Sequence, residues 1–181
     1  MPIDSSMPSL QQLSKVAVMP TRFSNISAPL AFLEKIHHVE INTTTEHAGV
    51  VYYQLGVYLK HNDSHIPTVK VTTCGEQPDY QLDKRFSDFA SLRHDVWFHA
   101  QRKHEDGNRC EYCGDFMSYI VHSMSQPRLF VKLATSVDAR KKLLGRFCNA
   151  FIENTLGDKS SCSGYQSIPH IVERFFRQDE A

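Results

Sequence analysis

The stretch from Leu82 to Leu92 constrains the fold of this chain more than any other. Its first half predicts a strand that ends in two cations and an aromatic residue. Its second half predicts a helix start with Ser87 as the N-cap. The guanidinium of Arg85 would then lie at a strand-to-helix junction, near the positive end of a helix dipole, where it can hold a phosphate through two parallel hydrogen bonds. Alternatively, Lys84 and Arg85 form a solvated strand end and Phe86 belongs to the core.

The order of the predicted elements indicates an α+β fold. β-Branched and aromatic residues predict three strands, over residues 36–43, 50–60 and 80–86. Apolar residues at helical spacing then predict helices over 87–103, 116–123, 136–156 and 167–176. Strands followed by helices, without alternation, predict a three-stranded antiparallel meander packed against a helical subdomain.

The 181 residues are expected to form one domain over residues 31–178. A flexible leader rich in Ser, Pro and Gln is expected over residues 1–30. Two inserts are predicted, a surface excursion around residues 61–79 and a segment containing Cys and His around residues 99–122.

Charge and cysteine content exclude several functional classes. Twenty basic residues balance twenty acidic ones, so no overall field recruits nucleic acid, and any anion site must be local. No apolar run approaches the roughly 20 residues needed to span a bilayer. An odd number of cysteines, five, without a secretory signal favours reduced thiols or metal ligation in an intracellular protein.

One cation interrupts the apolar stripe of the helix that is predicted to begin at Ser136. The stripe contains Val137, Leu144, Phe147, Cys148 and Phe151, and Arg140 lies in it. A cation on a buried helix face is costly unless it meets an anion or several hydrogen bonds. Arg140 is therefore expected to face a ligand, to snorkel or to form an internal salt bridge.

The sequence Lys84-Arg85-Phe86-Ser87-Asp88-Phe89, with Leu92 after it, resembles the signature of the Phox homology (PX) domain. That signature has two basic residues, an aromatic, Ser, Asp and Phe, and the resemblance covers residues 33–176. PX domains are phosphoinositide-binding modules of sorting nexins and NADPH oxidase subunits. The resemblance implies a cytoplasmic protein that binds phosphatidylinositol 3-phosphate and lies peripherally on endosomal or vacuolar membranes.

The family pattern also assigns roles to single residues. Its motif arginine, matched by Arg85, binds the 3-phosphate, and the following aromatic, matched by Phe86, packs against the inositol ring. A second arginine, matched by Arg140, binds the 4- and 5-hydroxyls. A third cation contacts the 1-phosphate from a proline-rich loop, where Arg128 is the best match and Lys132 the next.

The loop that carries this third cation departs from the family pattern. Pro127 is the only proline between residues 116 and 156, which leaves the path of the loop and the identity of the cation open. Apolar residues beside it either enter the membrane interface or belong to the core; they are Met117, Tyr119, Ile120, Met124 and Phe130.

A second motif has the spacing of a metal site. Cys110-Glu111-Tyr112-Cys113-Gly114 has the C-x-x-C-G form of a zinc knuckle, and an H-x4-H pair precedes it. The predicted structural zinc site consists of His99, His104, Cys110 and Cys113, with His94 and His122 as spare ligands. Ten histidines make a coincidence easy, and one C-x-x-C can be redox-active or inert. PX domains do not ordinarily carry zinc.

Three functions follow from these motifs. The leading one is a phosphoinositide-binding module that requires no cofactor and no catalytic residue, with a membrane surface and other proteins as partners. The second is a PX-fold protein-interaction scaffold with a weakened lipid pocket. The third is thiol or metal chemistry at Cys110, whose pKa the neighbouring Arg109 would lower. Because nothing else assembles around Cys110 in the sequence, an enzyme is not expected.

Overall fold

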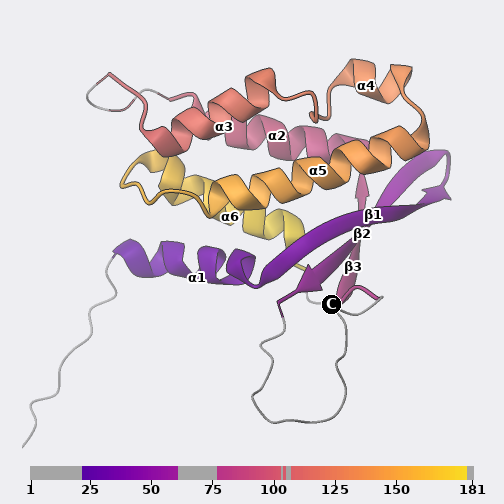
Figure 1. Cartoon of the computed structure of the whole chain (residues 1–181), viewed down its shortest axis with the longest axis horizontal. Helices are drawn as coiled ribbons and strands as arrows, with labels where there is room; N and C mark the ends of the chain where they lie inside the picture. Colours follow the sequence, from indigo (N-terminus) through magenta and orange to yellow (C-terminus); the bar gives the residue numbers. More distant parts are fainter. Residues whose placement is uncertain (1–21, 61–76, 103, 105–106, 179–181) are drawn as a thin grey trace, which may run out of the picture.

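The computed structural model describes residues 22–60, 77–102, 104 and 107–178, with the side chains of residues 22–27 and of residue 130 left out. Figure 1 shows three strands followed in the chain by helices that pack beside them. The elements are α1 (Arg22–Glu34), β1 (Ile36–His47), β2 (Val50–Leu59), β3 (Tyr80–Arg85), α2 (Phe86–Ala100), α3 (Glu111–His122), α4 (Leu129–Ala134), α5 (Val137–Thr155) and α6 (Ser163–Phe176). The predicted α+β fold with a three-stranded antiparallel meander is confirmed.

A two-residue turn closes the first hairpin of the sheet, which has the order β1-β2-β3. Ala48 and Gly49 both have positive φ, 51° and 76°, and His47 pairs with Val50 across the turn. Two residues of positive φ match the twist of a hairpin, although Ala48 bears a strain that glycine avoids. Figure 1 shows this turn at the same end of the molecule as α4.

The core lies between the sheet and the helices, and aromatic rings fill much of it. The Phe89 ring lies 6.5 Å from Phe147, which lies 4.1 Å from Phe151. These rings come from α2 and α5, so they join the junction helix to the long helix. The largest fully buried side chains are Tyr53, Tyr112, Phe89, Phe116, Phe147, Phe151, Phe176, Leu33, Leu55, Ile120, Leu144 and Ile168.

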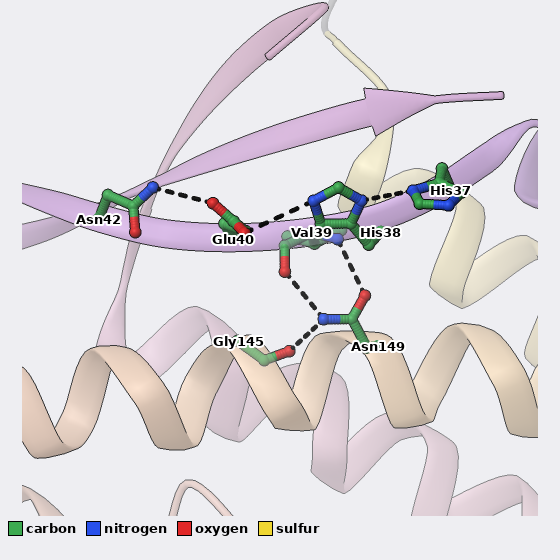
Figure 2. A network of polar contacts seen from close by, with 7 residues as sticks. All are labelled: His37, His38, Val39, Glu40, Asn42, Gly145 and Asn149. Atoms are coloured by element: carbon green, nitrogen blue, oxygen red, sulfur yellow. Dashed lines mark hydrogen bonds and ion pairs between the residues drawn. The ribbon is translucent and has the colours of Figure 1, made fainter. Parts of the chain in front are cut away.

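Helix α5 is tied to the edge strand β1 by one side-chain amide (Figure 2). The Val39 backbone N–H donates to Asn149 Oδ1 at 2.9 Å, and Asn149 Nδ2 donates to the Val39 carbonyl at 2.8 Å. Nδ2 also donates to the Gly145 carbonyl at 2.9 Å. The amide thus supplies to one edge residue the two hydrogen bonds that a further strand would supply.

Replacing this amide is expected to cost stability. Asn149→Leu would leave both backbone groups of Val39 unpaired, so we expect the free energy of unfolding to fall by about 1–3 kcal/mol. Urea denaturation measures this change. The control is Asn42→Leu, at an exposed position on β1, the strand of Val39. Its expected effect on the free energy of unfolding is within about 0.5 kcal/mol. Equal stabilities of the two variants would contradict the role given to Asn149.

Two helices begin earlier than predicted, because residues other than the predicted ones cap them. Helix α2 begins at Phe86, and its N-cap is Arg85, not Ser87; the Arg85 backbone N–H donates to Asp88 Oδ2 at 2.7 Å. Helix α6 begins four residues before the predicted Ser167, because Cys162 caps it and accepts the Tyr165 N–H on its sulfur. In contrast, the predicted Ser136 cap of α5 is confirmed, since its hydroxyl accepts the Ala139 N–H.

Further boundaries differ from the sequence prediction, and β1 runs to His47, four residues past the predicted end at 43. Helix α1 begins at Arg22, inside the leader expected over residues 1–30. Helix α2 ends at Ala100 rather than at residue 103, and α3 begins at Glu111, five residues before the predicted start. Helix α4 was not predicted at all. The excursion expected over 61–79 lies largely outside the described residues, which resume at residue 77.

Candidate functional sites

A cavity of about 330 Å³ lies where the junction of β3 and α2 meets the β1–β2 turn, α4 and the first turn of α5. Its volume falls in the range of small-molecule sites, roughly 300–1,000 Å³. The polar and aromatic side chains that line it are Tyr53, Arg85, Phe86, Ser87, Lys132 and Arg140. The structure therefore brings three of the four predicted lipid-site residues, Arg85, Phe86 and Arg140, to one cavity.

The cavity is lined by cations from three separate segments. Arg85 comes from the end of β3, Lys132 from α4 and Arg140 from α5. The Arg85 side chain is about half exposed, and its Nη2 lies 3.3 Å from Asp88 Oδ1. No acidic residue occurs among the described residues that line the cavity. The cavity thus favours an anion.

Arg140 has both a structural contact and a spare donor. Its Nη1 donates to the Lys132 carbonyl at 2.5 Å and to the Thr135 carbonyl at 3.1 Å, which holds the end of α4. Its Nε–H is buried and has no hydrogen-bond partner within the described part of the chain. The predicted stripe around it is shorter than expected, because Val137 is 37% exposed and burial begins at Leu144.

Arg128 lies away from the cavity. Its Nη2 donates to the carbonyls of Ile120 at 3.3 Å and Val121 at 2.9 Å, at the C-terminal end of α3. Guanidinium groups commonly satisfy the last carbonyls of a helix in this way, so the contact accounts for Arg128 structurally. The third cation of the cavity is Lys132, the second choice of the sequence prediction.

Exposed apolar side chains gather at α4 and the segment before it. Met124, Leu129 and Leu133 are 80%, 73% and 78% exposed, and Leu133 also lines the cavity. Of the residues expected at a membrane interface, Ile120 is core and Met117 and Tyr119 are half-buried. The Phe130 side chain lies outside the described residues. Across the described residues, every helix is too short or too polar to traverse a lipid bilayer.

A second cluster consists of three thiols and one imidazole, from His104, Cys110, Cys113 and Cys162. Their ligand atoms all lie within 4.8 Å of one another. The Cys162 sulfur lies 3.5 Å from that of Cys110 and 3.6 Å from that of Cys113. Sulfurs bound at about 2.3 Å to one tetrahedral zinc lie roughly 3.8 Å apart. The cluster can therefore hold a metal such as zinc.

The ligand set differs from the predicted one by one residue. His99 lies on α2 with its ring against Phe98, and it does not belong to the cluster. Cys162 takes its place, although it follows Cys113 by 49 residues. The C-x-x-C and H-x4-H motifs contain only residues that are close in sequence, so they do not indicate Cys162. A usable signal was the run of small residues around it, Ser160 to Gly164, directly before an apolar helix.

Two of the three thiols lie at helix N-termini. Cys110 caps α3 and Cys162 caps α6, where the helix dipole favours a thiolate. Burial opposes ionisation of Cys110, but hydrogen bonds from Ser160 and the neighbouring cysteines outweigh it and lower the Cys110 pKa. Burial, followed by the hydrogen bond and charge of Cys162, raises the pKa of Cys113.

Gly164 leaves room for the buried sulfur of this cluster. A Cβ at Gly164 would lie 2.6 Å from Cys113 Sγ, closer than real contacts allow, whereas a Cβ at Gly114 would meet open space. We expect Gly164→Ala to displace the sulfur and lower the free energy of unfolding by about 1–3 kcal/mol. Gly114→Ala, the matched helical control, should leave stability unchanged or raise it by up to about 1 kcal/mol. Thermal denaturation compares them, and a Gly164→Ala protein as stable as the control would refute this packing.

Comparisons with protein families, with curated proteins and with solved structures found no match to this chain.

Proposed function

We propose that this chain is a PX-like module that binds phosphatidylinositol 3-phosphate and thereby attaches to endosomal or vacuolar membranes. One observation carries the proposal: Arg85, Lys132 and Arg140 come from three separate segments and line one cavity that has no acidic residue among its described lining. Arg85 has one exposed ion pair, with Asp88, but no acidic side chain is among the described residues that line the cavity, so a bound anion would relieve the mutual repulsion of the three cations.

The chemistry of the cavity suits a phosphorylated polyol. Arg85 precedes the first turn of α2, so a phosphate there gains a guanidinium fork and the backbone N–H groups of a helix start. The Arg140 guanidinium lines the cavity and suits a ring hydroxyl, and the largely buried Phe86 forms part of the apolar wall. Lys132 would take the role that the family pattern assigns to Arg128. The head-group site requires no metal and no nucleophile.

Apolar side chains beside the cavity support attachment to a membrane. Leu129 and Leu133 are largely exposed on α4, and Leu133 also lines the cavity. Full burial of one such leucine contributes about 1.5–3 kcal/mol. Insertion of both would convert weak head-group binding into stable membrane residence.

Sedimentation with lipid vesicles tests this function. Wild-type protein should sediment with vesicles that contain phosphatidylinositol 3-phosphate and stay in the supernatant with neutral vesicles. A panel of the other phosphoinositides at equal charge measures the preference. Equal sedimentation with neutral and phosphoinositide vesicles would contradict the proposal.

A pair of variants tests whether Lys132 or Arg128 is the third cation that contacts the head group. Lys132→Gln removes one phosphate contact and should weaken vesicle binding roughly tenfold, which corresponds to about 1.4 kcal/mol. Arg128→Gln should leave binding unchanged and lower the free energy of unfolding by about 1–3 kcal/mol, because carbonyls of α3 lose their partner. Weaker vesicle binding of Arg128→Gln, with unchanged binding of Lys132→Gln, would identify Arg128 as the third cation.

A protein-interaction scaffold is the second proposed function. The exposed Met124, Leu129 and Leu133 suit an apolar protein surface as well as a membrane. A protein partner that is retained after both Arg85 and Arg140 are changed to glutamine would favour the scaffold.

A further inference from the structure

We propose that His104, Cys110, Cys113 and Cys162 bind one zinc ion in a closed, structural site. This inference is independent of the proposed lipid binding, because the cluster lies at the other end of α2. Arg85 precedes α2 and His104 follows it, and the 15 residues of that helix span about 22 Å. Figure 1 shows the starts of α3 and α6 at one end of the molecule, opposite α4.

The number and type of ligands point to zinc. Three thiolates and one imidazole complete a tetrahedral shell, and soft thiolates select zinc over the hard cations magnesium and calcium. A catalytic zinc keeps one position open for water, whereas this set supplies four protein ligands. The ion would therefore be structural.

The sulfur geometry fits a metal better than a disulfide. The sulfur–sulfur distances from Cys162 to Cys110 and Cys113, 3.5 Å and 3.6 Å, are close to the separation expected around one zinc and far from the roughly 2.05 Å of a disulfide. A disulfide would also use two sulfurs only. The third sulfur and the imidazole would then lie within 4.8 Å of the others without a reason.

The surroundings of the sulfurs match those of a thiolate site. The Tyr165 backbone N–H donates to the Cys162 sulfur at 3.2 Å, and the Ser160 hydroxyl donates to the Cys110 sulfur at 3.3 Å. Such donors orient metal-bound thiolates and disperse their charge. Gly164 lacks the side chain that would displace Cys113 Sγ. Three neighbouring residues, Ser160, Gly164 and Tyr165, thus accommodate the sulfurs of the cluster.

Zinc would connect segments that are far apart in the sequence. His104 lies in the link between α2 and α3, two of the cysteines lie at the start of α3, and Cys162 caps the start of α6. The described residues between Gln101 and Cys110 form neither helix nor strand. A shared ion would fix this link against the two helices.

Metal analysis of the purified full chain tests the proposal. Wild-type protein should hold about one zinc per chain, and His104→Ala should lower zinc affinity at least about 100-fold. The matched control is His99→Ala, which lies five residues away on α2 and should keep its zinc. Loss of zinc in His99→Ala but not in His104→Ala would overturn the ligand set.

A cobalt titration keeps the test decisive if a variant fails to fold. Reduced, metal-free wild-type protein should bind one equivalent of Co²⁺, with the absorption of a tetrahedral thiolate complex, and zinc should displace it. Mass spectrometry under native conditions should show one added zinc and free thiols. Absence of both the cobalt absorption and the zinc adduct, or a Cys110–Cys162 disulfide in the metal-free native chain, would overturn the proposal.

Discussion

Removing the proposed zinc is expected to lower the free energy of unfolding by at least about 3–5 kcal/mol. Structural zinc sites bind their ion with roughly 10–16 kcal/mol, and domains have a total stability of about 5–15 kcal/mol. Part of the binding energy is offset when the freed thiols are solvated or protonated. For a chain of this length the loss corresponds to a fall in Tm of about 6–20 °C.

Chelation and mutation should produce this loss without adding to each other. A strong chelator should lower the Tm of wild-type protein, and Cys162→Ser should have a similarly lowered Tm that the chelator does not change further. Cys148→Ser is the cysteine control: this thiol is buried in α5 outside the cluster, so the chelator should still destabilise the variant. A wild-type Tm that is unaffected by the chelator would contradict a stabilising ion.

Loss of either cavity arginine is expected to weaken binding to phosphatidylinositol 3-phosphate vesicles by about 10–100-fold. Each charge-assisted hydrogen-bond set contributes about 1.5–3 kcal/mol, and each 1.4 kcal/mol corresponds to a factor of ten. Arg85→Gln is the cleaner variant, because Arg85 is half exposed and its side-chain ion pair with Asp88 is exposed. Arg140→Gln also removes the bonds that hold the end of α4.

A matched control separates a loss of site from a loss of charge. Arg146→Gln removes the same group from the exposed face of the same helix, outside the cavity lining. It should keep nearly wild-type affinity. Arg140→Lys retains the charge but loses the planar fork, and we expect it to restore only part of the binding. Equal losses in Arg140→Gln and Arg146→Gln would mean that binding depends on net charge and not on the cavity.

The fold class could be predicted because its signals are local. Strand and helix periods of apolar residues gave the meander and the long helix, and the Ser136 cap was found where a hydroxyl precedes an apolar stripe. The prediction failed where an unusual residue caps a helix. Arg85 caps α2 through the Asp88 carboxylate, and Cys162 caps α6 with a sulfur, so neither start matched the preferred cap residues.

In the two sites, the sequence predicts the residues that lie within one motif or one helix, but not those that only tertiary packing brings to the site. Arg85 and Phe86 are adjacent in one motif, and Arg140 interrupts the apolar pattern of the sequence, although burial in α5 begins only at Leu144, so both signals could be read from the chain. That Lys132 and not Arg128 lines the cavity follows from a tertiary contact, because the Arg128 guanidinium donates to carbonyls at the end of α3. The sequence does not show this contact. Likewise, Cys162 reaches the other cysteines only because α6 packs back onto the elements that precede it.

Vesicle sedimentation of three proteins tests the central proposal most directly: wild type, Arg85→Gln and Arg146→Gln, each with vesicles containing phosphatidylinositol 3-phosphate. We expect wild type and Arg146→Gln to sediment with similar affinity, and Arg85→Gln to sediment about 10–100-fold more weakly at an unchanged Tm. Equal sedimentation of all three proteins would contradict a head-group site at the junction of β3 and α2.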